Sequence, residues 1–185
     1  MPANEDNKTG YWESEPCAVI CLRHPAEVVQ SLAKRKREPI NRQEAGLSWL
    51  RHTLDAERDT RRWRRAFVDY SRIVENWAQA VELVGDKLGV DWPRGAVDAT
   101  KDVTSIIDVK YRHHFASSLD FSWAGAPWYE RTYAILGAYA TGVEPDLTHS
   151  VELDEIAQAF ANASRPFEQH IAALEAVLAL RRLRT

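Results

Sequence analysis

The chain has few cysteines and no long apolar run, and both absences exclude classes of protein. Its two cysteines, Cys17 and Cys21, are too few for a disulfide framework and leave a metal site short of two ligands. We expect both to be buried, reduced thiols. No apolar run approaches the roughly 20 residues that a membrane span needs, and the polar N-terminus has no signal-peptide pattern. The sequence therefore predicts a cytoplasmic protein with no metal and no membrane partner.

Net charge is also small, at −3, so no overall field favours nucleic acid, and we expect no nucleic-acid partner. Residues 31–65 differ from the rest, because eleven basic residues against five acidic ones give this segment a local charge of +6. Such a segment either concentrates an anionic ligand or forms solvated helix faces, and the sequence leaves both interpretations open. The basic run 61–65, which includes Trp63, is better explained as a solubilised turn than as a base-stacking surface.

Apolar periodicity predicts two strands, over residues 18–22 and 66–70, and the near-continuous apolarity of the first predicts burial on both faces. A helix over 71–88 is expected to begin with Ser71 as its N-cap and to close at Gly89. Residues 91–126 are predicted to be mainly loop, with 103–107 as one short element. The remaining predicted helices are 25–37, 43–62, 127–141, 150–163 and 165–184.

Helical connections between strands favour parallel pairing, which predicts an α/β fold. Two parallel strands alone make a poor sheet, because parallel sheets occur as buried layers of several strands. The missing strands lie within residues 91–126, upstream of Met1 or on another polypeptide. We expect a flexible lead-in over residues 1–15, an α/β portion with a partial parallel sheet over 16–126, and a helical tail over 127–185.

A candidate binding site follows the first predicted strand. Arg23 ends this strand directly before a helix that begins at Pro25, an arrangement that can bind an anion through the guanidinium and free backbone N–H groups. It also lies where open α/β sheets bind their ligands. Ser31, about two turns into the helix, can donate its hydroxyl to the same anion. The alternative is an arginine that only caps the helix.

Arg23-x-Pro25, with Ser31 eight residues after the arginine, resembles the 3′-phosphate-binding motif of the PAPS-dependent sulfotransferases. The resemblance continues in order along the chain and is similar to bacterial members of that family over residues 47–61, 65–77, 88–93 and 109–114. It implies a partial P-loop-type sheet in which Arg23 and Ser31 bind the 3′-phosphate of PAPS (3′-phosphoadenosine 5′-phosphosulfate) or of its product PAP. Lys110 and Arg112 would be weaker cofactor contacts, whereas His113 and His114 are better explained as exposed loop residues.

The resemblance implies transfer of a sulfuryl group from PAPS to a hydroxyl or amine of a small-molecule or glycan acceptor. The family's 5′-phosphosulfate loop and a catalytic acid or base have no counterpart before Cys17, so we assign no catalytic residue. The alternative is a truncated, catalytically inactive relative that serves as a nucleotide-binding or protein-interaction module. Its partner would be an upstream half, or a second copy packed along the stripe formed by Phe167, Ile171, Leu174 and Leu178.

Overall fold

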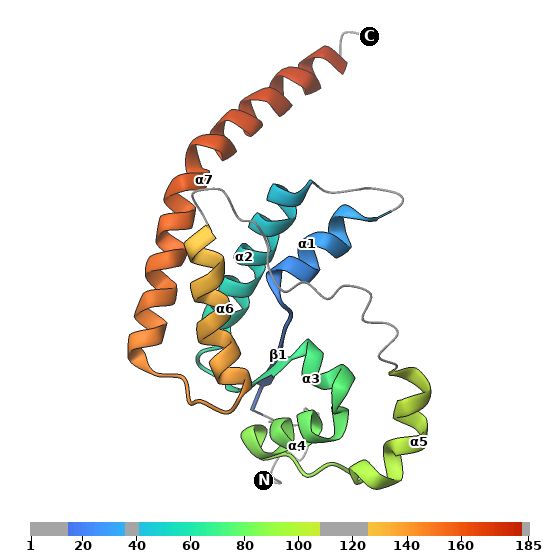
Figure 1. Ribbon diagram of the computed structural model, residues 1–185. Coiled ribbons are helices and arrows are strands. Elements are labelled where there is room, and N and C mark those ends of the chain that lie inside the picture. Colours follow the sequence, from blue (N-terminus) through green and yellow to red (C-terminus); the bar gives the residue numbers. More distant parts are fainter. Residues whose placement is uncertain (1–14, 36–40, 108–125, 183–185) are drawn as a thin grey trace, which may run out of the picture.

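A computed structural model describes residues 15–35, 41–107 and 126–182, with side chains in these ranges except at Ala126 and 166–182. The fold is mixed α/β and mostly helical (Figure 1). In chain order the elements are β1 (Cys17–Leu22), α1 (Pro25–Ala33), α2 (Arg42–Asp59), β2 (Arg64–Asp69), α3 (Tyr70–Glu75), α4 (Trp77–Leu88), α5 (Ala96–Ile106), α6 (Ala126–Ala140) and α7 (Leu147–Arg182). Along these described ranges no helix is long and apolar enough to cross a membrane.

The two strands pair in parallel, as the sequence predicts, and the register sets Val19 opposite Ala66 and Leu22 opposite Asp69. No third strand joins them within the described ranges. Because successive side chains of a strand point to opposite faces, Leu22 and Phe67 contribute to the core on one face and Ala66 to the core on the other. The sheet therefore separates two apolar clusters.

The larger cluster packs one sheet face against α2, α6 and α7, and the ring of Trp49 stacks on that of Tyr129 with centroids 5.8 Å apart. Its largest members are Leu22, Trp49, Leu50, Leu54, Phe67, Tyr129, Ile135, Leu136, Tyr139 and Leu153. The smaller cluster packs β2 against α4 and consists of Ala66, Val68, Ala80, Val84 and Leu88. Burial of these side chains supplies the main driving force for folding.

Burial of β1 on both faces is a wrong prediction, and so is burial of its thiols. Val19 is 53 % exposed, and the free cysteines Cys17 and Cys21 are both exposed. The reason is that α4 covers Ala66 and Val68 of β2 but leaves the neighbouring residues of β1 uncovered. A continuous apolar run predicts a strand, but it does not specify which elements cover that strand.

The helix predicted over 71–88 is divided in two at Asn76. This residue leaves the helical region, with φ −149° and ψ 71°, and its side chain caps α4 by accepting a hydrogen bond from the N–H of Gln79. Asp69, not Ser71, is the N-cap of α3, since its carboxylate accepts from the N–H of Ser71 at 2.8 Å. The prediction for Gly89 is confirmed, because it ends α4 in the left-handed region with φ 62°.

Three further helices, α1, α5 and α7, also differ from prediction. α1 ends at Ala33 rather than near residue 37, and α5 occupies part of the segment predicted as loop. α7 is one helix from Leu147 to Arg182, although two were predicted, and Figure 1 shows it bending near its middle. Pro166 lies within it, where a proline removes one backbone hydrogen bond and commonly bends a helix without ending it. The side chains of the 167–178 stripe and residues 108–125 lie outside the described set.

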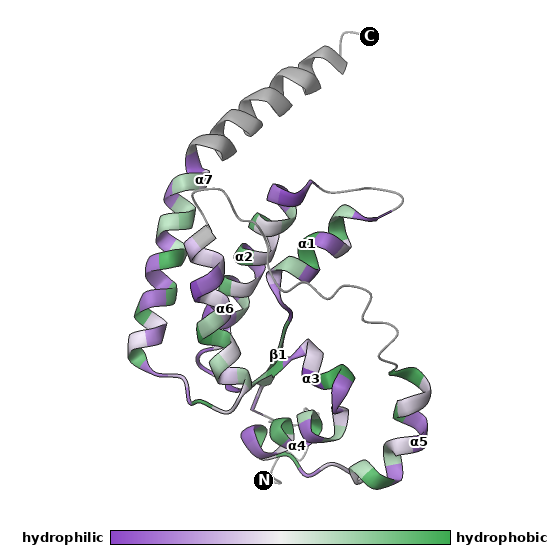
Figure 2. Cartoon of the chain, viewed as in Figure 1, coloured by the Kyte–Doolittle hydropathy of each residue, from purple (hydrophilic) through white to green (hydrophobic). Residues whose placement is uncertain are grey.

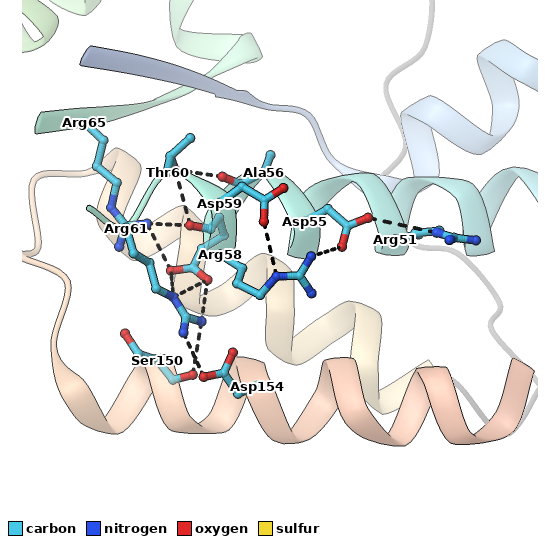
Figure 3. Close-up of polar contacts among 11 residues, drawn as sticks. Arg51, Asp55, Ala56, Arg58, Asp59, Thr60, Arg61, Arg65, Ser150 and Asp154 are labelled. Atoms are coloured by element: carbon cyan, nitrogen blue, oxygen red, sulfur yellow. Dashed lines mark hydrogen bonds and ion pairs between the residues drawn. The ribbon is translucent and has the colours of Figure 1, made fainter. Parts of the chain in front are cut away.

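A buried ion network ties α2 to β2 and α7 (Figure 3). The side chain of Glu57 is fully buried and accepts hydrogen bonds from Arg61 at 2.7 Å and Arg65 at 3.1 Å. Arg61 also donates to Asp154 of α7 at 2.7 Å, and these carboxylates raise the pKa of its guanidinium. Part of the basic segment therefore neutralises acidic groups of the chain itself.

Candidate functional site

The candidate site lies at the carboxyl edge of the sheet. Because β1 and β2 are parallel with Leu22 opposite Asp69, the residues that follow the two strands meet at this edge. Arg23 and His24 follow β1, and Tyr70 follows β2. This is the edge at which open α/β sheets bind ligands.

Arg23 is held by contacts on three sides. Its Nε donates to Oε2 of Glu27 at 3.2 Å, and its guanidinium lies over the ring of Tyr70, 4.6 Å from the centroid. Its backbone carbonyl accepts a hydrogen bond from Nε1 of Trp49 at 3.0 Å. The Arg23 side chain is still 26 % exposed, whereas that of Glu27 is 4 % exposed. The guanidinium is therefore fixed in orientation and reachable from solvent.

Ser31 lies on the same face of α1 as Glu27, since residues four apart in a helix are neighbours. Arg23, Glu27 and Ser31 thus follow one another along one side of α1. Ser31 is half-buried. The pair of predicted anion ligands is consequently brought to one side of the helix, with a carboxylate between them.

The backbone N–H groups expected to complete the anion site are already used. The N–H of Ala26 donates to Nδ1 of His24, and those of Glu27 and Val28 donate to the carbonyl of His24. The first-turn Pro25 has no N–H. Nη1 and Nη2 of Arg23 make no hydrogen bond to any described residue. These two nitrogens are therefore the donors that this edge of the sheet offers to an anion, and a guanidinium can donate two parallel bonds to phosphate oxygens.

His24 caps α1 and packs its ring edge against Tyr133 of α6, with centroids 4.7 Å apart. Burial lowers the pKa of this imidazole, although the carboxylates of Glu27 and Asp69 act in the opposite direction. Its Nδ1 accepts from the N–H of Ala26, so the neutral ring carries its proton on Nε2. In this tautomer neither ring nitrogen is free to accept a proton from a substrate.

Asp69 organises the edge from the β2 side. Its carboxylate accepts hydrogen bonds from the N–H and Oγ of Ser71 and from the hydroxyl of Tyr133 at 3.1 Å. Tyr133 lies 64 residues further along the chain, so this contact joins β2 to α6. Sequence reasoning missed Tyr70, Asp69 and Tyr133, and only the strand-end position of Asp69 was a signal that could have found one of them.

A separate cavity of about 790 Å³ lies on the α4 side of the sheet. It is lined mainly by apolar side chains, among them Val19, Val68, Ile73, Trp77, Val84 and Trp92, and neither Arg23 nor Ser31 belongs to its lining. In the part of the chain that the structure describes, no group of three or more His, Cys, Asp or Glu side chains is arranged to hold a metal ion. Anion binding at Arg23 and apolar binding in this cavity are thus separate capacities.

The predicted weaker contacts Lys110 and Arg112, together with His113 and His114, lie outside the described residues. The chain matches no protein-family model, no curated protein and no solved structure.

Proposed function

We propose that the chain is a sulfotransferase-like protein that binds PAPS or PAP through its 3′-phosphate, with Arg23 and Ser31 as the phosphate ligands. The observation that carries the proposal is the arrangement directly after a parallel strand. Glu27 and Ser31 lie on one side of α1, and Arg23, which precedes the helix, pairs with Glu27. A phosphate monoester carries close to two negative charges, whereas the single positive charge of Arg23 is already balanced by the carboxylate of Glu27. Binding therefore depends on directed hydrogen bonds as well as on charge.

The family resemblance supports extending this proposal to catalysis in a P-loop-type fold. The location that we propose for the protein, from its composition alone, is the cytoplasm. When bound, PAPS supplies the sulfuryl group. A hydroxyl or amine of the acceptor attacks the sulfur, the bond between sulfur and the 5′-phosphate oxygen breaks, and PAP leaves. The acceptor proton passes to a base, and we assign this role to no residue because His24 is held in a tautomer unsuited to it.

Isothermal titration calorimetry with PAP and AMP tests the phosphate site, because AMP lacks the 3′-phosphate. We expect PAP to bind more tightly than AMP to the wild-type protein. Arg23→Ala should cost about 2–5 kcal/mol of PAP binding, at least about a 30-fold rise in Kd, and should remove the preference over AMP. Equal Kd values for wild type and Arg23→Ala, or for PAP and AMP, would refute the assignment.

Three further variants separate loss of binding from loss of folding. Ser31→Ala removes one hydroxyl without disturbing the ion pair of Arg23 with Glu27, and Arg23→Lys keeps the charge but loses the planar fork. Both should weaken PAP binding while the circular dichroism spectrum stays that of the wild type. Arg58→Ala is the matched control, because Arg58 lies on the exposed side of α2 and pairs with Asp55 and Asp59. It should leave the Kd for PAP unchanged.

A second candidate function is binding without catalysis, in a nucleotide-binding or interaction module. The hydrogen bonds of His24 and Asp69 favour this second function. Both side chains are already bonded to neighbouring residues, so neither is placed to act as an acid or base. Transfer of radiolabelled sulfate from PAPS to a panel of hydroxyl and amine acceptors separates the two functions. Sustained turnover by the 185-residue chain alone would exclude the inactive module.

A further inference from the structure

The apolar cavity on the α4 side of the sheet has the size and lining of a small-molecule site. Its volume of about 790 Å³ lies within the range of about 300–1,000 Å³ that such sites have. Its lining comes from both strands, from α3, α4 and α5, and from the connection between α4 and α5. Figure 2 shows hydrophobic residues on α4 and along β1. A ligand that fills the cavity would cover Val19 and Trp92, which are 53 % and 44 % exposed.

Trp92 is fixed as one wall of this cavity. Its Nε1 donates a hydrogen bond to the carbonyl of Val81 at 3.0 Å. A Cβ at Gly85 would lie 2.8 Å from the same nitrogen, so the ring lies directly on the surface of α4, where a glycine leaves room for it. Because the one polar atom of the indole is already bonded, the ring presents to a ligand only its apolar surface, whose face also attracts cations.

The charged side chains of the lining select the charge of the ligand. Glu82 and Arg94 bring charge to this lining. Arg94 donates to the carboxylate of Asp102 at 3.0 Å and to the carbonyl of Asp98 at 2.7 Å, so its charge is balanced. Glu82 makes no hydrogen bond or ion pair with any described residue. A carboxylate without a partner, beside an apolar cavity, favours a cationic ligand and opposes an anionic one.

A second, smaller hollow strengthens this preference. It has a volume of about 400 Å³, shares Glu82 and Trp92 with the cavity, and is lined in addition by Asp86 and Asp91. Neither aspartate pairs with a described residue. The guanidinium of Arg64 lies beside this hollow and can offset one of the three carboxylates. The apolar cavity therefore ends next to a region of negative charge.

We propose that the cavity binds an apolar molecule that ends in a positively charged amine. The hydrocarbon part lies against Val19, Trp77 and Val84, and the ammonium group lies at Glu82 and the ring of Trp92. Burial of the hydrocarbon supplies most of the affinity, and the carboxylate and the indole face both attract the ammonium group. A fatty acid of the same length would bring its carboxylate toward Glu82 and is disfavoured.

Isothermal titration calorimetry with octylamine, octanol and octanoate tests this preference, because the three probes share one chain and differ in the head group. At about pH 7.5 the amine is protonated and the acid is ionised. We expect octylamine to bind most tightly and octanoate most weakly. Decylamine, with two more methylenes, should bind about 15-fold more tightly than octylamine. No binding of octylamine, or octanol or octanoate binding as tightly as octylamine, would refute the proposal.

Two pairs of variants locate the binding. Ala99→Trp fills the cavity from α5 and should weaken octylamine binding at least about 10-fold, whereas Val97→Trp, on the same helix but 87 % exposed and outside the lining, should not. Glu82→Gln should raise the Kd of octylamine about 2–5-fold without changing that of octanol, and Glu155→Gln on α7 should change neither. Circular dichroism checks that each variant folds.

Equal Kd values for octylamine within either pair would overturn the proposal. The Glu82 pair keeps this test available if Ala99→Trp does not fold, because Glu82 is exposed. Arg23→Ala should leave octylamine binding unchanged, since Arg23 does not line the cavity. This test therefore stands apart from that of the nucleotide site.

Discussion

Replacing Glu57 with alanine tests whether the buried ion network stabilises the fold. The carboxylate is fully buried and is the common partner of Arg61 and Arg65, whose side chains are 26 % and 9 % exposed. Its removal leaves the two guanidinium groups without their shared partner, although Arg61 retains Asp154. Breaking a buried pair in this way costs about 3–5 kcal/mol, most of it from the charge left behind.

Urea denaturation followed by circular dichroism measures this loss. With a slope of about 2 kcal/mol per molar urea, the midpoint should fall by roughly 2 M at an unchanged slope. The control is Asp154→Asn, because Asp154 is 50 % exposed and an exposed pair contributes only about 0.2–1 kcal/mol. The reasoning fails if Glu57→Ala loses less than about 1 kcal/mol or no more than the Asp154 variant does.

The remaining predictions concern one titrating group and one backbone conformation. Because burial lowers the pKa of His24, the unfolded chain takes up a proton first as the pH falls below the ordinary value of 6.5. The free energy of unfolding should thus fall from pH 6.5 downward, and His24→Asn, which keeps a capping oxygen, should flatten that slope in urea titrations; an unchanged slope contradicts this. Gly89→Ala should lower stability by about 1 kcal/mol at a φ of 62°, whereas Gly137→Ala in α6 should not, because a Cβ added there would meet open space. Equal effects of the two substitutions would refute the strain argument.

Local signals in the sequence predicted most elements but not their partners. The apolar run of β1, the first-turn Pro25 and Gly89 each depend on a few neighbouring residues, and the structure confirms the elements that they predict. The break at Asn76 was missed because no glycine or proline marks it. α5 was missed, apart from the short element predicted at 103–107, because more than half of its residues are polar and none of its side chains is fully buried.

The site was predictable only in its local part. Arg23 and Ser31 follow from a spacing along one helix, which the sequence contains directly. Tyr70 and Tyr133 reach the site from the start of α3 and from α6, over tertiary contacts that no local pattern encodes. Glu57 illustrates the same limit, because a glutamate within a highly charged, amphipathic helix is expected on the solvated face and instead is fully buried.

A crystal structure of the protein with bound PAP tests the central claim most directly. We expect an oxygen of the 3′-phosphate within about 2.7–3.0 Å of the terminal guanidinium nitrogens of Arg23, and a second oxygen at hydrogen-bond distance from Oγ of Ser31. A phosphate bound elsewhere on the chain, with Arg23 still paired only to Glu27, would contradict the account.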